Sequence, residues 1–198
     1  AIASGQSAVM IAGGAESMSL IPMGGHDLLP NPALIESTPR VYCTMGLTAE
    51  NVASQFNISR EDQDAFALRS HQRALKAINQ GRFDDEIVPV LVKETHYTAG
   101  HAETTETIFQ VDEGPRPDTS LEALAKLKPV FRLKGSVTAG NASQMSDGAA
   151  ATILVYEAVA KALGLQPLGK MLGFAVAGVP PEIMGIGPVE AVPKVLNQ

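Results

Sequence analysis

Two short runs of apolar and small residues, far apart along the chain, predict strands of a buried sheet. Residues 8–14 read Ala-Val-Met-Ile-Ala-Gly-Gly, and residues 149–156 form a similar run. Continuous apolar runs of this length are typical of strands that are covered on both faces, as in parallel sheets. We therefore expect two buried, parallel strands in a layered α/β fold.

The longest helical pattern follows Ser59. Ser59 suits a helix N-cap, and Glu61 and Asp62 are acidic residues in the first turn. Apolar residues then recur at helical spacing as far as Ile78, and Gly81 supplies a stop.

Shorter patterns predict the remaining elements. Further helical segments are expected at residues 1–4, 48–56, 119–127, 157–163 and 187–196. Further strands are expected at residues 86–92 and 168–179. Residues 18–45 show no steady period and are expected to be irregular, residues 93–112 to form a polar surface excursion, and residues 137–143 a turn of small residues.

Composition limits the function classes. Hydrophobic residues make up 45% of the 198 residues and charged ones 18%, which is typical of a soluble globular protein. The apolar runs are too short to cross a bilayer, so we expect no membrane span. The net charge of −6 disfavours a nucleic-acid partner.

The metal-ligating residue types give no recognisable site. His26, His71, His96 and His101 fit no zinc spacing, and Cys43 is the single cysteine. Cys43 could be a nucleophile, but no base accompanies it in a known arrangement, so we favour an inert thiol. We expect no metal.

Three positions could contact a ligand, and each has a plain structural alternative. His71 lies on the apolar side of its helix, either as a hydrogen-bonded, partly buried histidine or as a pocket lining. Arg116 lies in an acidic turn that is either solvated or grips a phosphate through the guanidinium. Residues 140–143 form either a tight turn or a place of close ligand approach, with the Ser143 hydroxyl as a polar anchor.

Seven blocks in series resemble the thiolases. The blocks are residues 10–19 (MIAGGAESMS), 45–53 (MGLTAENVA), 58–64 (ISREDQD), 112–116 (DEGPR), 124–131, 137–147 and 178–188. Their order and spacing match from Ala1 to Gln198. The variants at residues 112–116 and 181–188 resemble the degradative 3-ketoacyl-CoA thiolases. Biosynthetic relatives often carry His where this chain has Thr44.

The resemblance implies a partial thiolase fold, a layered αβαβα arrangement with an inserted loop domain. It assigns residues 1–19 to the end of the N-terminal half and residues 20–142 to a CoA-binding loop domain. Residues 143–165 would return to the N-terminal half, and residues 166–198 would begin the C-terminal half.

The activity implied is acyl transfer between 3-ketoacyl-CoA and CoA, which gives acetyl-CoA and a shortened acyl-CoA in fatty acid β-oxidation. Thiolases use a nucleophilic cysteine, a histidine and a second cysteine. The resemblance puts all three outside these 198 residues, and Cys43 aligns with neither cysteine. The chain alone is therefore expected to be inactive, with CoA and acyl-CoA as substrates of the parent enzyme and not as permanent cofactors.

The resemblance also implies ligand contacts. Eight residues are expected to contact CoA or its acyl group: Met45, His71, Arg116, Phe131, Ala139, Ala142, Ser143 and Met184. Arg116 would lie near the adenine and phosphate end, and Ser143 would bond to the pantetheine. Met45 and Met184 would line the acyl end.

Two other interpretations stay open. The first is a non-catalytic CoA-ester or lipid-binding protein on a thiolase-like fold, and the second is a scaffold subunit that pairs with another thiolase chain. The parent protein is expected to be a homodimer or homotetramer. Its expected compartment is the cytoplasm, or the mitochondrion or peroxisome if it is eukaryotic.

Overall fold

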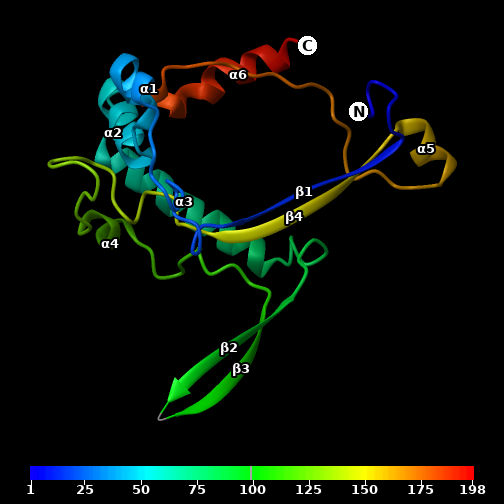
Figure 1. Cartoon of the computed structure of the whole chain (residues 1–198), viewed down its shortest axis with the longest axis horizontal. Helices are drawn as coiled ribbons and strands as arrows, with labels where there is room; N and C mark the ends of the chain where they lie inside the picture. The colour runs from blue at the N-terminus through cyan, green and yellow to red at the C-terminus, as the bar shows by residue number, and fades with distance from the viewer. Residues whose placement is uncertain (99) are drawn as a thin grey trace. The chain divides into compact units, whose positions relative to one another are not determined.

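The computed structural model describes residues 1–98 and 100–198 (Figure 1). Its elements are, in chain order, β1 (Val9–Ser17), α1 (Pro32–Ser37), η1 (Pro39–Tyr42), α2 (Met45–Gln55), α3 (Arg60–Asn79), β2 (Val90–Thr98), β3 (His101–Phe109), α4 (Leu121–Ala125), β4 (Asp147–Val155), α5 (Glu157–Ala162), η2 (Pro181–Ile186) and α6 (Gly187–Leu196). They divide into two compact units. The first unit comprises residues 1–52 and 143–198, and the second comprises residues 53–142.

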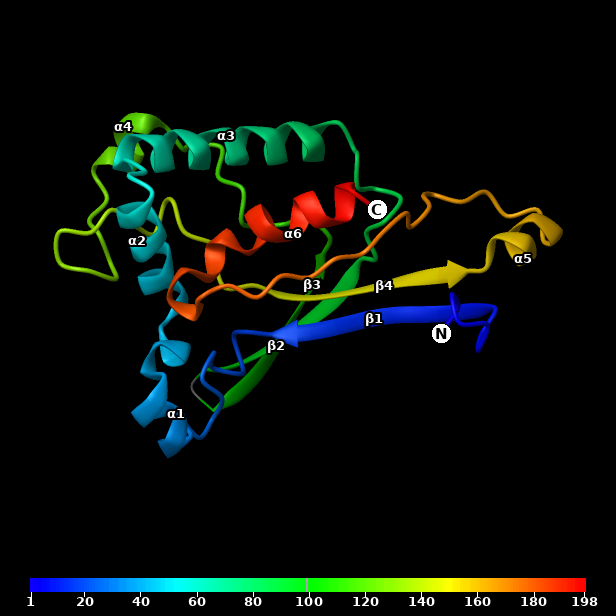
Figure 2. The same cartoon turned by 90° about the horizontal axis from the view of Figure 1, so that it is seen from above.

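Strands β1 and β4 form the sheet of the first unit, and they are antiparallel. They pair in register along their full length, from Val9 opposite Val155 to Ser17 opposite Asp147 (Figure 2). The Asp147 carboxylate accepts hydrogen bonds from the Ser19 backbone N–H, at 2.9 Å, and from the Ser19 hydroxyl. The prediction of parallel strands is wrong, because the chain leaves this sheet and returns to it at the same end.

The predicted burial of these strands is also wrong for the described chain. Ile11 is 73% exposed and its partner Ile153 is 70% exposed. In the described residues the sheet has two strands, and nothing covers its faces sufficiently to bury these side chains. The apolar composition is typical of a covered strand, whereas these side chains are exposed in the described chain.

The second unit contains a hairpin where the sequence predicted a polar surface excursion after residue 92. Strands β2 and β3 pair from Val90 opposite Phe109 to Thr98 opposite His101. Polar residues face each other across it, as in the Lys93–Glu106 ion pair at 2.5 Å. Such cross-strand pairs stabilise the polar part of the ribbon. The polarity correctly predicted exposure, but it concealed the strands.

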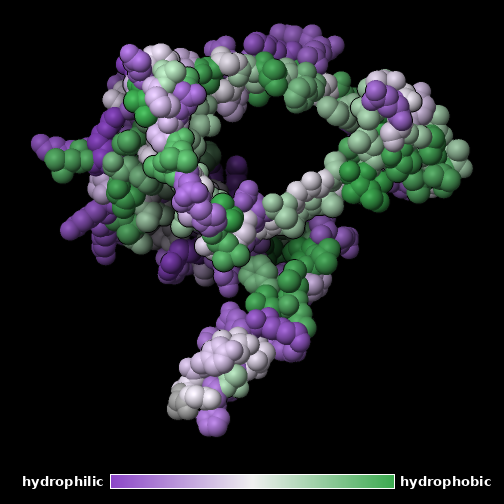
Figure 3. All heavy atoms as spheres, in the orientation of Figure 1, coloured by the Kyte–Doolittle hydropathy of each residue, from purple (hydrophilic) through white to green (hydrophobic). Residues whose placement is uncertain are grey.

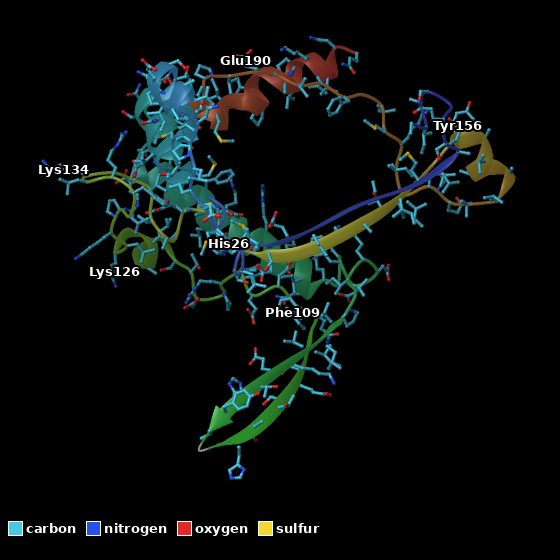
Figure 4. All side chains as sticks on the ribbon, in the orientation of Figure 1. His26, Phe109, Lys126, Lys134, Tyr156 and Glu190 are labelled. Atoms are coloured by element: carbon cyan, nitrogen blue, oxygen red, sulfur yellow. The ribbon has the colours of Figure 1, made fainter. Side chains whose placement is uncertain are left out.

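Hydrophobic residues gather at the base of this hairpin, and a hydrophilic band lies directly beyond them (Figure 3). The base includes Val90, Leu91, Ile108 and Phe109, all of which are exposed. Figure 4 labels Phe109, where β3 ends. The strand predicted at residues 86–92 begins only at Val90.

Helix α3 confirms the longest predicted helix. The Ser59 hydroxyl accepts from the Asp62 backbone N–H at 3.0 Å, and Gly81 adopts a φ of +63° just beyond the C-terminal end. Helix α4 packs against α3. Its N-cap is Ser120, which accepts from the Ala123 backbone N–H at 3.1 Å, so the helix lies within the predicted residues 119–127 and is shorter than predicted.

Backbone hydrogen bonds fix the end of the predicted helical segment at residues 1–4 and the start of α2. The Gly5 N–H donates to the Ile2 carbonyl and the Gln6 N–H to the Ala1 carbonyl, both at 3.0 Å, which is the pattern of a helix C-terminus. Helix α2 begins before the predicted Thr48, because the Thr48 N–H already donates to the Thr44 carbonyl at 2.9 Å. Helices α5 and α6 agree with the prediction.

Two predictions for the first unit need correction. Residues 18–45 are not wholly irregular, because Asn31 caps α1 by accepting from the Ala33 N–H at 2.9 Å, and η1 follows. Residues 168–179 are not a strand. The Gln198 side-chain amide bonds to both backbone groups of Phe174, at 3.2 and 2.9 Å, in place of a neighbouring strand.

The helices of the described chain include none with both the length and the apolar character needed to cross a bilayer.

Candidate functional site

Two of the predicted ligand contacts meet in the second unit. His71 lies on α3 and is half-buried, and its Nδ1 accepts a hydrogen bond of 3.1 Å from the backbone N–H of Arg116. An imidazole nitrogen that accepts a hydrogen bond carries no proton, so neutral His71 holds its proton on Nε2. The sequence allows two interpretations of His71, a hydrogen-bonded and partly buried histidine or a residue that lines a pocket. The structure contains the hydrogen bond of the first interpretation.

The Arg116 guanidinium makes a two-pronged contact with Asp118. Its Nε donates to Oδ1 at 3.2 Å and its Nη2 donates to Oδ2 at 3.0 Å, and both side chains are exposed. A guanidinium offers the same fork of donors to a phosphate. The hydrogen bond from Arg116 is the main cause that lowers the pKa of Asp118, and the same contact raises the pKa of Arg116.

The Asp118 carboxyl is expected to titrate below its ordinary pKa of 3.8. Because Arg116 favours the ionised carboxylate, the contact is fully present above pH 3.8 and is lost as pH falls through the lowered pKa. A carbon-13 NMR titration would measure this midpoint, and Arg116→Gln should move it upward. A midpoint that is the same with and without Arg116 would contradict the contact.

Three more predicted residues, Phe131, Ala139 and Ala142, lie in the second unit. Phe131 and Ala139 are exposed and Ala142 is half-buried. The turn that carries the two alanines is fixed from inside, because Thr138 is fully buried and its carbonyl accepts from the Ala142 N–H at 3.1 Å. The turn therefore presents small side chains on a fixed backbone.

The other three predicted residues, Met45, Ser143 and Met184, lie in the first unit and are exposed. The Ser143 hydroxyl donates to the carbonyl of Gln144 at 3.2 Å. Met45 begins α2, and Met184 lies in η2.

The segments that carry the two methionines are bonded to each other through side chains that the sequence did not single out. The Asn51 amide on α2 donates to the Glu182 carbonyl on η2 at 3.0 Å. The Glu182 carboxylate in turn pairs with Arg40 of η1 at 2.5 Å. The hydrogen bond from Arg40 contributes to the lowered pKa of Glu182, after a larger contribution from the backbone N–H of Glu182. These residues act by holding η2, and no short-range pattern predicts a bond across 131 positions.

A small depression of about 240 Å³ lies at the C-terminal end of α3, and none of the eight predicted contacts lines it. Apolar side chains and three carboxylates line it: Ile78, Phe83, Asp84, Glu86, Ile87, Gln110, Val111 and Asp112. The carboxylates disfavour an anionic ligand there.

Cys43 is a free, half-buried thiol at the end of η1. Among the residues that the structure describes, no three His, Cys, Asp or Glu side chains gather as metal ligands would. In the second unit, the Arg116 guanidinium and the small side chains of Ala139 and Ala142 are groups that suit ligand binding.

Comparison with known proteins identifies the family. The family described as "Thiolase, N-terminal domain" matches residues 1–158. A 3-ketoacyl-CoA thiolase of Bacillus subtilis is 56% identical over 94% of this chain, and an acetyl-CoA acetyltransferase of Pseudomonas aeruginosa is 45% identical over all of it. The chain covers 48% and 52% of these two relatives, so it spans about half the length of the curated relatives it matches.

Solved structures agree with the sequence matches. The dimeric peroxisomal thiolase of Saccharomyces cerevisiae superposes with a TM-score of 0.84 at 42% identity, over 99% of this chain and 48% of that one. Human mitochondrial 3-ketoacyl-CoA thiolase in complex with CoA gives 0.79 at 40% identity, over 98% of this chain and 49% of that one. The chain therefore belongs to the thiolase family and has a partial α/β thiolase fold.

Proposed function

We propose that the protein to which this chain belongs is a 3-ketoacyl-CoA thiolase, which transfers an acyl group between 3-ketoacyl-CoA and CoA in fatty acid β-oxidation. The observation that carries the proposal is the 56% identity to the Bacillus subtilis 3-ketoacyl-CoA thiolase over 94% of this chain. Acetyl-CoA acetyltransferases match at lower identity, which favours the degradative branch.

The role proposed for this chain is to bind CoA and its thioesters as substrates. The forked donors of Arg116 suit a phosphate, and the small side chains of Ala139, which is exposed, and Ala142, which is half-buried, leave room for a narrow chain such as pantetheine. His71 is proposed to line the ligand, with Phe131 packing nearby. The human mitochondrial relative whose structure is in complex with CoA supports CoA as the ligand.

In the first unit we propose that Ser143 bonds to the pantetheine and that Met45 and Met184 contact the acyl group. Thioether side chains adapt to ligands of varied shape, which suits a site that takes different acyl groups. The CoA-binding loop domain proposed for residues 20–142 contains the whole compact second unit. The nucleophilic cysteine, the histidine and the second cysteine are proposed to lie in the remainder of the parent protein.

The assembly proposed for the parent protein is a homodimer or homotetramer, which the dimeric yeast neighbour supports. Its proposed location is the bacterial cytoplasm, or the mitochondrion or peroxisome of a eukaryote. Peroxisomal relatives from human and mouse support the last of these.

The activity is tested on the full-length gene product. Its mass in solution is measured, and acetoacetyl-CoA and a longer 3-ketoacyl-CoA are each supplied with free CoA. CoA-dependent loss of both substrates, faster for the longer one, is the expected result. Binding of the esters without turnover would instead indicate a non-catalytic carrier, and neither binding nor turnover would leave a scaffold subunit.

Arg116→Ala in the full-length product is expected to raise the Kd for CoA roughly tenfold, because a charge-assisted contact to phosphate is lost. Calorimetric titration would measure this change. A pantetheine thioester without nucleotide phosphates is the matched control, and its affinity should not change. An equal loss for both ligands would place the role of Arg116 elsewhere.

A further inference from the structure

The side chain of Asn141 connects one turn to helix α3. Its Oδ1 accepts from the Thr138 backbone N–H at 2.7 Å. Its Nδ2 donates to the Ser136 carbonyl at 3.1 Å and to Asp64 Oδ1 at 2.9 Å. One carboxamide has an acceptor and two N–H donors, so these three bonds use all of them in one orientation.

Asp64 is itself held in place. It is 4% exposed, and its second oxygen, Oδ2, accepts from Arg60 Nε at 2.8 Å. The Arg60 Nη2 also donates to the carbonyls of Leu124 and Leu127, at 2.6 and 3.0 Å. A buried carboxylate with both oxygens bonded cannot rotate without leaving a polar group unpaired, which costs free energy.

Hydrogen bonds and side-chain packing hold the inner side of the turn at residues 138–142 in place. The Thr138 hydroxyl accepts from the Gly140 N–H at 3.1 Å. A methyl group on Gly140 would lie 2.5 Å from side-chain carbons of both Leu124 and Leu127, so the backbone there packs directly on them. The outer side is different, because Ala139 is exposed and Ala142 is half-buried.

From this geometry we infer that Asn141, held by Asp64, is a positioning residue that shapes residues 138–142 before CoA arrives. The inference rests on the proposed function, in which Ala139 and Ala142 contact the pantetheine. A turn already fixed in its bound shape loses little conformational entropy when the ligand binds, and the affinity rises accordingly. Asn141 does not touch the ligand and acts through the backbone of this turn.

The first test compares two amide side chains of the second unit in the full-length gene product. Asn141→Ala should raise the Kd for CoA about tenfold, while hydrogen exchange stays slow in α3 and becomes faster at residues 138–142. Gln63→Ala is the control. It removes a 2.9 Å bond to the Ser136 hydroxyl from α3, leaves the Asn141 contacts in place, and should not change the Kd.

A second test needs only the unmodified protein. The amides of Thr138, Gly140, Asn141 and Ala142 all have acceptors in the structure. Their exchange should therefore already be slow without CoA and should change little on its addition. Large new protection on CoA binding would overturn the inference, as would Asn141→Ala with wild-type affinity. If the unmodified protein fails to bind CoA, the proposed function itself fails.

Discussion

Replacing Asp64 by alanine is expected to lower the free energy of local opening of α3 by about 3–5 kcal/mol. Asp64 accepts from Arg60 at 2.8 Å and from Asn141 at 2.9 Å, and it is 4% exposed. Its removal leaves the mostly buried Arg60 guanidinium without its counter-ion and one Asn141 N–H without an acceptor. An unpaired charge in such a place costs far more than the pair itself contributes.

Hydrogen exchange of the full-length product would measure the effect, since slow amides in the middle of α3 report its opening free energy. The matched control is Asp118→Ala, which removes the carboxylate of the Arg116–Asp118 contact in the same unit. Both partners of that contact are exposed, so little measurable change is expected. Equal effects at the two positions would mean that burial does not govern the Asp64 contact.

The second large effect is expected at Leu124. Its replacement by alanine should lower the free energy of opening of α3, α4 and the turn by about 2–5 kcal/mol. Leu124 is 3% exposed on α4, which packs against α3, and its side chain also lies against Gly140. The shorter side chain removes apolar contacts and leaves a cavity, because the backbone of the 138–142 turn is fixed and cannot close over it.

The same hydrogen-exchange measurement applies, now on the amides of α3, α4 and the turn. Leu133→Ala is the control, because Leu133 is 92% exposed and should contribute little. A small change at Leu124 would mean that the turn and α4 relax to fill the space, contrary to the rigid turn described above.

The parts of the fold that local chemistry determines were predictable. Ser59 and Gly81 mark both ends of α3, because a hydroxyl cap and a glycine with positive φ act on their immediate neighbours. The direction of the β1–β4 pairing was not predictable, because an apolar run carries no information about strand orientation. The hairpin was missed because its pairs beyond Val92 are mostly polar and show no apolar alternation.

The candidate site likewise has features that the local sequence predicts and features that only the fold reveals. Arg116 and His71 could be named from the sequence, but the bond between them spans 45 positions and needs the fold. The Arg60–Asp64 pair has the i, i+4 spacing of a helical ion pair, and that signal could have been noticed. Its link to Asn141 spans 77 positions, and no local pattern reports it.

The bonds between Ser19 and Asp147 have a consequence for how relatives can diverge. The chain leaves the β1–β4 sheet after Ser17 and rejoins it at Asp147, which is the residue paired with Ser17. The residues between these two points therefore form an insertion at one end of a pair of antiparallel strands. Because the entropy of closing a loop rises only slowly with its length, residues could be added or removed there at small cost. Relatives can therefore differ in the length of this insertion, and in the ligands that it binds, while the strand register from Val9 to Ser17 stays unchanged.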